Sequence, residues 1–224
     1  MNLEDIQKSY GVIVSLGGLC QVTNQIKRHN LRTFSGPLDW FYYPSLSDVN
    51  RLLQNRFKKF MKLENMIIEG SESYGLIESE FDNQIKWAER ITYCIKDTYY
   101  NCFSMHDFPI NSENDLKSTY PSFKAKLDTR INQFLEKINS SESILFIRIW
   151  GNRDEAVELQ NVLSKITNKN FNILIVNFKE GISNIVEQNW GISRVCSIEL
   201  PRYQDRWEGD DSDWDVILNK ITLT

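Results

Sequence analysis

The chain has 224 residues, of which 41% are hydrophobic and 25% charged, and its formal net charge is −4. These values are typical of a globular protein with a packed core, and we expect a single domain over residues 1–224. No run of lysines and arginines resembles a nucleic-acid footprint, and no apolar run approaches the roughly 18 residues of a membrane span. We therefore expect neither nucleic acid nor a membrane as a partner.

The N-terminal segment MNLEDIQKSY lacks the apolar core of a signal peptide, so we expect a cytoplasmic protein. The four cysteines are scattered and form no CxxC pair, which indicates reduced thiols. Only two histidines are present, neither at ligand spacing from a cysteine pair, so we expect no metal site. We expect no cofactor either, because neither GxGxxG nor a P-loop occurs. The sequence does not indicate an oligomeric state.

The first third of the chain contains a strand, a glycine turn and a helix in succession. Residues 12–16 (VIVSL) are typical of a strand buried on both faces, and Gly17 and Gly18 separate it from a helix predicted over residues 19–29. An anion could bind at this turn. Residues 31–44 then form a loop that contains two prolines.

The middle of the chain combines helices with a hairpin. Ser45 and Asp48 form a capping-box pattern ahead of an amphipathic helix, which is marked by Leu46, Val49, Leu53, Phe57 and Phe60. Two aromatic-rich runs on either side of Lys96 and Asp97 indicate a β-hairpin, and His106 follows its second strand. The strongest helical pattern consists of Phe123, Leu127, Ile131, Phe134, Leu135 and Ile138.

The last third alternates between strands and helices. Apolar strands are predicted over residues 144–150, 172–178 and 195–200, with amphipathic helices over 156–166 and 212–221. We therefore predict an α/β fold with a mainly parallel central sheet flanked by helices, and a helical and hairpin excursion between about residues 31 and 120. The alternative is an α+β fold, with the Cys20 helix packed against an antiparallel sheet that carries His106.

Cys20 is the candidate nucleophile because it lies at a predicted helix start, beyond the carboxyl end of a parallel strand. Unpaired N–H groups and the helix dipole favour a thiolate there, with pKa values of about 3.5 to 7.5. His106 is the better proton acceptor, since His29 lies roughly 13 Å further along the same helix. A packed cysteine and a surface histidine are the alternatives.

Four segments stand out in order along the chain: SLGGLC (15–20), LRTFSGPLDWFYYP (31–44), SMHDF (104–108) and ILFIRIW (144–150). Together they resemble the landmarks of a bacterial family of unknown function that is described as papain-like cysteine peptidases, and this resemblance makes the α+β alternative a papain-like fold. The resemblance implies Cys20 as nucleophile and His106 as general base. It also gives functional weight to Ser35, Asp39, Trp40 and Asp107, whereas Leu38 replaces an aromatic residue of the family pattern.

The acidic and basic residues of these segments have candidate roles. Asp39 could orient the His106 imidazole, or could instead cap a turn or helix, while Asp107 is less suited because it is the next residue on an extended chain. Trp40 is a core or pocket-wall aromatic. Arg148 interrupts an apolar strand, so we expect an anionic partner (Asp39, Asp107, or a substrate carboxylate or phosphate) or an edge position from which it reaches water.

Two functions follow from these patterns. The first is a cysteine hydrolase, peptidase or acyltransferase that acts on a peptide or small acyl substrate, with backbone N–H groups of residues 18–20 facing the oxyanion. Its expected substrate-binding residues are Ser15, Gly18, Ser35, Trp40, Asp107 and Arg148. The second is a non-catalytic module that binds an anionic or glycan-linked ligand through Arg148 and the aromatic loop 40–43.

Overall fold

The computed structural model of the chain describes residues 1–72, 75–78, 85–88, 91–110, 115–202 and 206–224. The N-terminal half contains α1 (Leu3–Ile6), β1 (Ser9–Tyr10), β2 (Val12–Ser15), α2 (Gln21–Arg28), β3 (Phe41–Tyr42), α3 (Leu46–Gln54), a short 3-10 helix (Leu63–Asn65), β4 (Met66–Glu72), β5 (Gly75–Glu78), β6 (Ile85–Ala88), β7 (Thr92–Asp97) and β8 (Cys102–Ser104). The C-terminal half contains α4 (Leu116–Ser140), β9 (Ser143–Ile149), α5 (Arg153–Ile166), β10 (Asn170–Lys179), β11 (Val186–Gln188), β12 (Val195–Pro201), α6 (Asp211–Leu218) and β13 (Thr222–Leu223).

The larger sheet has the strand order β11-β12-β10-β9-β2. β2, β9, β10 and β12 run parallel to their neighbours, whereas β11 pairs with β12 in the antiparallel sense at one edge. Val12 lies opposite Ile144, so the two strands predicted over residues 12–16 and 144–150 are direct neighbours in one sheet. Their continuous apolar runs are explained by burial on both faces.

The second sheet is antiparallel and has the order β3-β8-β7-β4, while β5 and β6 form a separate antiparallel pair. The sheets are thus mixed or antiparallel, and the prediction of a mainly parallel architecture is wrong for the chain as a whole. Only β7 and β8 are joined by a short hairpin connection, whereas β3 pairs with β8 and β4 with β7 across longer stretches of chain, so local sequence patterns did not reveal this sheet. The mixed α/β arrangement of helices and several sheets is also compatible with the α+β alternative.

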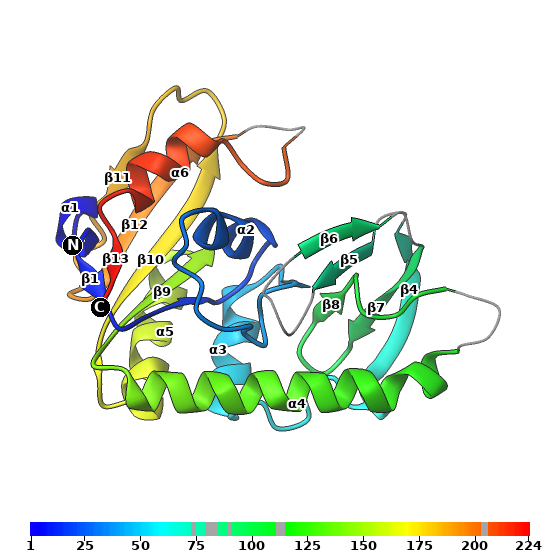
Figure 1. Ribbon diagram of the computed structural model, residues 1–224. Helices are drawn as coiled ribbons and strands as arrows, with labels where there is room; N and C mark the ends of the chain where they lie inside the picture. Colours follow the sequence, from blue (N-terminus) through cyan, green and yellow to red (C-terminus); the bar gives the residue numbers. More distant parts are fainter. Residues whose placement is uncertain (73–74, 79–84, 89–90, 111–114, 203–205) are drawn as a thin grey trace.

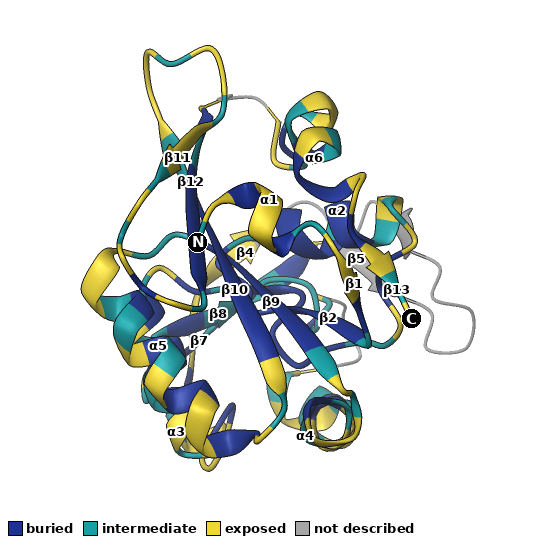
Figure 2. Cartoon of the chain, turned by 90° about the vertical axis from the view of Figure 1, so that its left-hand side faces the viewer, coloured by how far each residue is buried: buried dark blue, intermediate teal, exposed yellow. Residues whose placement is uncertain are grey.

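Helices cover both faces of the larger sheet (Figure 2). Alternate strand residues such as Val14, Phe146 and Ile173 pack into a core shared with α3, α4 and α5. The intervening residues, such as Ile13 and Ile147, pack with α1, α2 and α6. Because successive side chains of a strand point to opposite faces, each strand is packed between two apolar layers. Polar groups can therefore gather only at the ends of the strands.

Most predicted helices are present with shifted ends. α3 stops at Gln54, and Phe57 belongs instead to a following turn with a positive φ of 60°. Ser45 precedes α3 without capping it through its side chain, so the predicted capping box is not formed. α4 starts earlier than predicted, at Leu116, and runs beneath both sheets (Figure 1).

The predicted hairpin is formed by β7 and β8, but its turn lies further along the chain than expected. Lys96 and Asp97 are the last residues of β7 rather than the turn itself. The Asp97 carboxylate accepts hydrogen bonds from the backbone N–H groups of Tyr99 and Tyr100 at 2.8 and 3.1 Å, which stabilises the turn that follows. β8 then ends at Ser104, two residues before His106.

Candidate functional site

Cys20 and His106 lie together although they are 86 residues apart in the sequence. The Cys20 Sγ is 3.7 Å from the Nε2 atom of His106, within hydrogen-bond range for sulfur. His29 is engaged elsewhere, because its Nε2 lies 3.1 Å from the Asp215 carboxylate. The structure therefore brings the predicted thiol to the predicted imidazole.

The short strand β3 joins the two halves of this site. Tyr42 forms a β-bridge with Gly18, and the backbone N–H of Tyr43 donates to the Gly18 carbonyl at 3.3 Å. On its other side β3 pairs with β8, with Phe41 opposite Ser104. The loop over residues 31–44 thus connects the turn before Cys20 to the strand before His106, which gives a structural reason for its distinctive sequence.

The glycine turn before Cys20 needs residues without a side chain. Gly17 and Gly18 have φ values of 72° and 99°, which favour glycine. A Cβ atom on Gly18 would lie 2.3 Å from the carbonyl oxygen of Ile149. The hydroxyl of Ser15 accepts a hydrogen bond from the Gly17 N–H at 3.2 Å inside the protein. Ser15 and Gly18 therefore shape the turn, and their predicted substrate contacts stay predictions.

The electrostatic surroundings of Cys20 oppose the predicted thiolate. Burial of the thiol, with smaller contributions from the charges of Asp39 and Asp107, raises the pKa of Cys20 to about 12. The backbone N–H of Cys20 itself lowers the pKa, but by less than burial raises it. The raised pKa runs against the prediction of a dipole-stabilised thiolate, because burial favours the protonated thiol of Cys20.

Asp39 is held in a buried ion pair. Its Oδ2 accepts hydrogen bonds from Arg32 Nη2 at 2.7 Å and from the backbone N–H of Gly36 at 2.8 Å. The backbone carbonyl of Asp39 accepts a further bond from the Thr23 hydroxyl of α2 at 3.0 Å. Asp39 thus has the turn-stabilising role that was one of its two expected roles. Orientation of His106 by Asp39 stays a prediction.

The other predicted residues of the landmark segments have the following surroundings. Asp107 accepts a hydrogen bond from the Ser104 hydroxyl at 2.6 Å, at the end of β8. Trp40 is buried, with the Arg32 guanidinium 6.0 Å from its ring centroid. Ser35 is half-buried in the same loop. Substrate binding by Ser35, Trp40 and Asp107 stays a prediction.

Arg148 differs from its prediction. It is fully buried, and its guanidinium donates to the carbonyl oxygens of Leu16, Tyr43 and Trp150 at 3.1, 2.9 and 3.2 Å. Burial lowers the pKa of Arg148 to about 10. Among the residues that the structure describes, Arg148 has no carboxylate hydrogen-bond partner and does not lie at a sheet edge, and backbone carbonyls at the ends of β2 and β9 and after β3 are its acceptors. Arg148 therefore ties together the backbone at the ends of β2 and β9 and after β3, and its predicted substrate contact stays a prediction.

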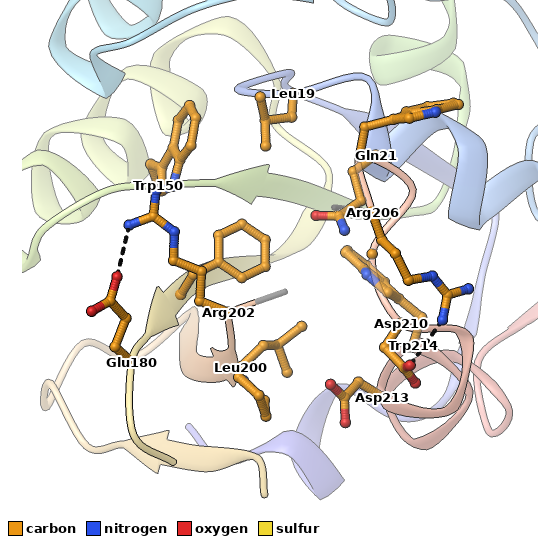
Figure 3. A pocket seen from close by; sticks show the side chains of 14 residues that line it. Leu19, Gln21, Trp150, Glu180, Leu200, Arg202, Arg206, Asp210, Asp213 and Trp214 are labelled. Carbon is orange, nitrogen blue, oxygen red and sulfur yellow. Dashed lines mark hydrogen bonds and ion pairs between the residues drawn. The ribbon is translucent and has the colours of Figure 1, made fainter. Parts of the chain in front are cut away.

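The structure also reveals a pocket that the sequence analysis missed. It has a volume of about 430 Å³, and its walls include Leu19 and Gln21, the residues on either side of Cys20 (Figure 3). Further walls come from the ends of β10 and β12 and from residues 206–214. The acidic run EGDDSDWD over residues 208–215 contributes Gly209, Asp210, Asp213 and Trp214 to these walls. Trp207 precedes this run and Trp214 lies within it. These two large aromatic side chains were the sequence feature that could have indicated a cavity.

Within the described ranges, no three histidine, cysteine, aspartate or glutamate side chains gather in a way that could hold a metal ion. The same residues include no helix with the length and apolar character needed to cross a membrane.

Comparison with known proteins identifies the family. Residues 11–181 match a family described as "Putative papain-like cysteine peptidase (DUF1796)". The chain belongs to this family. The match includes all four landmark segments, and so it includes Cys20 and His106.

A relative in this comparison comes from a virus. The chain is 24% identical over 223 residues to an uncharacterized protein of Acanthamoeba polyphaga mimivirus, covering 93% of this chain and 98% of the relative. A bacterial origin, which the resemblance implied, finds no support in this relative. No solved structure matches the chain.

Proposed function

We propose that the protein is a thiol-dependent acyl hydrolase or acyltransferase, in which Cys20 is the nucleophile and His106 the general base. The observation that carries this proposal is the 3.7 Å separation of Cys20 Sγ and His106 Nε2. A nucleophile and a base within hydrogen-bond reach are the minimum that covalent acyl transfer requires. Membership of the cysteine peptidase family agrees with this chemistry.

The raised pKa of Cys20 determines the order of events. Because the thiol is neutral in the resting protein, His106 Nε2 removes its proton as the sulfur attacks the substrate carbonyl. The carbonyl oxygen becomes an oxyanion, which we expect the backbone N–H groups of residues 18–20 to stabilise. His106 then protonates the leaving amine or alcohol, and an acyl-thioester remains on Cys20.

A second nucleophile completes the reaction. Water, or an acceptor amine or alcohol, attacks the thioester carbonyl while His106 Nε2 takes its proton, and the thiol is released with that proton returned to sulfur. The charges of Asp39 and Asp107, which raise the pKa of Cys20, would stabilise the imidazolium formed in each half of the reaction. We expect a peptide or small acyl substrate.

The alternative of a non-catalytic anion-binding or glycan-binding module is less well supported. Arg148, the residue expected to bind the anion, has no exposed surface. Trp40 and Phe41 of the aromatic loop are also buried. The residues on which this alternative depended are therefore used for packing.

The test is covalent acylation at a defined residue. The protein is incubated with a panel of p-nitrophenyl esters and peptidyl coumarin amides, product release is recorded, and the acylated residue is located by mass spectrometry. We expect acylation at Cys20, which Cys20→Ala abolishes and His106→Ala slows by roughly 100-fold or more. Cys94→Ala and His29→Ala serve as matched controls and should leave the rate unchanged. Equal labelling of all cysteines, unaffected by His106→Ala, would contradict the proposal.

A further inference from the structure

The pocket beside Cys20 has the position and size of a small-molecule site. Its walls come from the turn and first residue of α2, from the residues that follow β9 and β10, and from the end of β12 (Figure 3). It therefore opens at the carboxyl ends of the parallel strands, where ligands of open α/β sheets bind. A volume of about 430 Å³ lies within the usual range for such sites. We name it the tryptophan pocket, after Trp150, Trp207 and Trp214 in its walls.

Three polar atoms in the walls of the tryptophan pocket have no hydrogen-bond partner among the residues that the structure describes. They are Oε1 of Gln21, Nε1 of Trp214 and Oδ2 of Asp213. Gln21 is 3% exposed and Trp214 is fully buried. A buried polar atom without a partner costs about 1–3 kcal/mol, and such atoms are rare in folded proteins. A ligand in the pocket would supply the missing partners.

The chemistry of these atoms describes the ligand. Gln21 Oε1 and Asp213 Oδ2 need donors, whereas Trp214 Nε1 needs an acceptor. An amide group provides both a donor and an acceptor, so it can satisfy Gln21 and Trp214. Gln21 directly follows Cys20 in the chain, and Leu19 precedes it, so the pocket adjoins the segment that carries the thiol, although Cys20 and His106 do not line it.

The charges of the pocket favour a cation. Arg202 pairs with Glu180 at 3.4 Å and Arg206 with Asp210 at 3.1 Å, as the dashed lines in Figure 3 mark. In these two pairs the charge of each arginine is balanced by a carboxylate. Among the charged residues that line the pocket, Asp213 is the one left without an opposite charge. Burial and the charge of Asp210 raise the pKa of Asp213, as expected for a carboxylate without a compensating cation. An anionic ligand would have to displace an existing carboxylate, whereas a cation would pair with Asp213.

The apolar walls complete the description. Leu19, Phe178 and Leu200 lie in the pocket together with the three tryptophans. Aromatic faces attract cations and also bury the methylene groups that carry them. A hydroxylated ligand such as a sugar could stack on the same rings, but it would leave the charge of Asp213 uncompensated.

We propose that the tryptophan pocket binds a protonated amine on an apolar, amide-containing stem, with Asp213 holding the ammonium and Gln21 and Trp214 holding the amide. This inference rests on the proposed function in one respect: the bound group is the part of the acyl substrate that positions its carbonyl at Cys20. Two sources offer this chemistry, the α-amine of a peptide N-terminus and the side-chain amine of a lysine.

Binding is measured on the Cys20→Ala protein, in which no acyl transfer can occur. Intrinsic tryptophan fluorescence and calorimetry report binding of four probes: leucinamide, N-acetyl-leucinamide, 6-aminohexanamide and hexanamide. Tighter binding of leucinamide than of its acetylated form indicates the α-amine, and tighter binding of 6-aminohexanamide than of hexanamide indicates the side-chain amine. Equal binding within both pairs, or no binding of any probe, overturns the proposal.

Variants separate pocket recognition from general charge effects. Asp213→Asn should weaken binding of the preferred amine roughly tenfold or more and leave its uncharged counterpart unaffected. Asp154→Asn is the matched control, since the Asp154 side chain is 94% exposed and does not line this pocket. Gln21→Met should weaken both members of a probe pair, because it removes the amide contact and keeps the apolar volume. A cooperative thermal unfolding transition at or above the melting temperature of the Cys20→Ala parent establishes that each variant is folded.

The two proposals fail in different ways. Loss of acylation in the Cys20→Ala protein with intact amine binding supports both. Amine binding to a protein that acylates no ester or amide, even with the preferred amine in the acyl group, would contradict the catalytic proposal and retain the pocket. Acylation at Cys20 with no preference for amines would contradict the pocket alone.

Discussion

Arg32 and Asp39 form an ion pair that is almost closed to water: the Nη2 and Oδ2 atoms are 2.7 Å apart, and the two side chains are 2% and 3% exposed. The pair holds the loop over residues 31–44, whose strand β3 contacts both the turn before Cys20 and the strand before His106. Removing one partner leaves a buried charge without compensation, which is more costly than losing an exposed pair.

We therefore expect Arg32→Met to lower the free energy of unfolding by about 3–5 kcal/mol. Lys169→Met is the control, because the Glu142 side chain that Lys169 pairs with is 91% exposed, and we expect a loss of less than about 1 kcal/mol. Urea denaturation of the two variants measures both values. Equal small losses would mean that the buried pair does not hold the loop.

Gly18 should tolerate no side chain. Gly18→Ala combines a positive φ with a Cβ atom 2.3 Å from the Ile149 carbonyl oxygen, so the turn before Cys20 must move or the protein must unfold. Gly181→Ala is the matched control, because Gly181 also has a positive φ of 78° but no atom within 4 Å of the added Cβ. We expect the control to cost roughly 1–2 kcal/mol and Gly18→Ala clearly more. Thermal melting distinguishes them.

The pKa of Cys20 predicts how its reactivity depends on pH. A thiol with a raised pKa stays protonated at neutral pH, so iodoacetamide should label Cys20 slowly near about pH 6 and progressively faster towards about pH 9. Mass spectrometry of timed samples gives the rate at each pH. A high rate already at about pH 6, with a plateau above it, would instead indicate a thiolate and imidazolium pair in the resting protein.

Arg148 should be irreplaceable by lysine. Its guanidinium reaches three carbonyl oxygens in different directions, whereas an ammonium on a single stem cannot reproduce this fork. Leaving even one or two of the carbonyls unpaired costs about 1–3 kcal/mol each. We expect Arg148→Lys to lower the melting temperature markedly. A melting temperature equal to that of the parent would show that water or the lysine replaces these bonds.

Asp213 should destabilise the unliganded protein at neutral pH. Since its pKa is raised in the folded state, the folded protein favours the protonated carboxyl, and stability is lost as pH rises through the folded pKa. Asp213→Asn removes the charge and should raise the melting temperature at neutral pH but not at acid pH, where the carboxyl is already protonated. A lower melting temperature at neutral pH would indicate that a partner stabilises the carboxylate.

The strands and helices of the larger sheet could be predicted because their signals are local. Continuous apolar runs marked β2, β9, β10 and β12, and alternating burial against two helical layers explains those runs. The antiparallel sheet was harder to predict, since it depends on which distant strands pair. The strand β3 has only two residues, which is too short for an alternating pattern to be recognised in the sequence. It nevertheless joins the two halves of the site.

The candidate site, like the fold, could be predicted only where its signals are local in the sequence. Residue type and position selected Cys20 and His106, because a thiol at a helix start and a histidine at a strand end are visible in the sequence. The pKa of Cys20 was not predictable, since it depends on burial and on carboxylates from other segments. The same holds for Arg148, whose backbone partners come from three separate places in the chain.

The position of β2 at the edge of the larger sheet has a consequence for synthesis. Its neighbour in the sheet is β9, which begins only at Ser143, so the strand that leads to Cys20 is made long before the strand that supports it. Until β9 has left the ribosome, β2 presents unpaired backbone groups and an apolar surface that nascent-chain chaperones can cover. The surroundings of Cys20 are therefore assembled late, and if the proposed acyl transfer occurs, nascent chains that end before β9 should not carry it out.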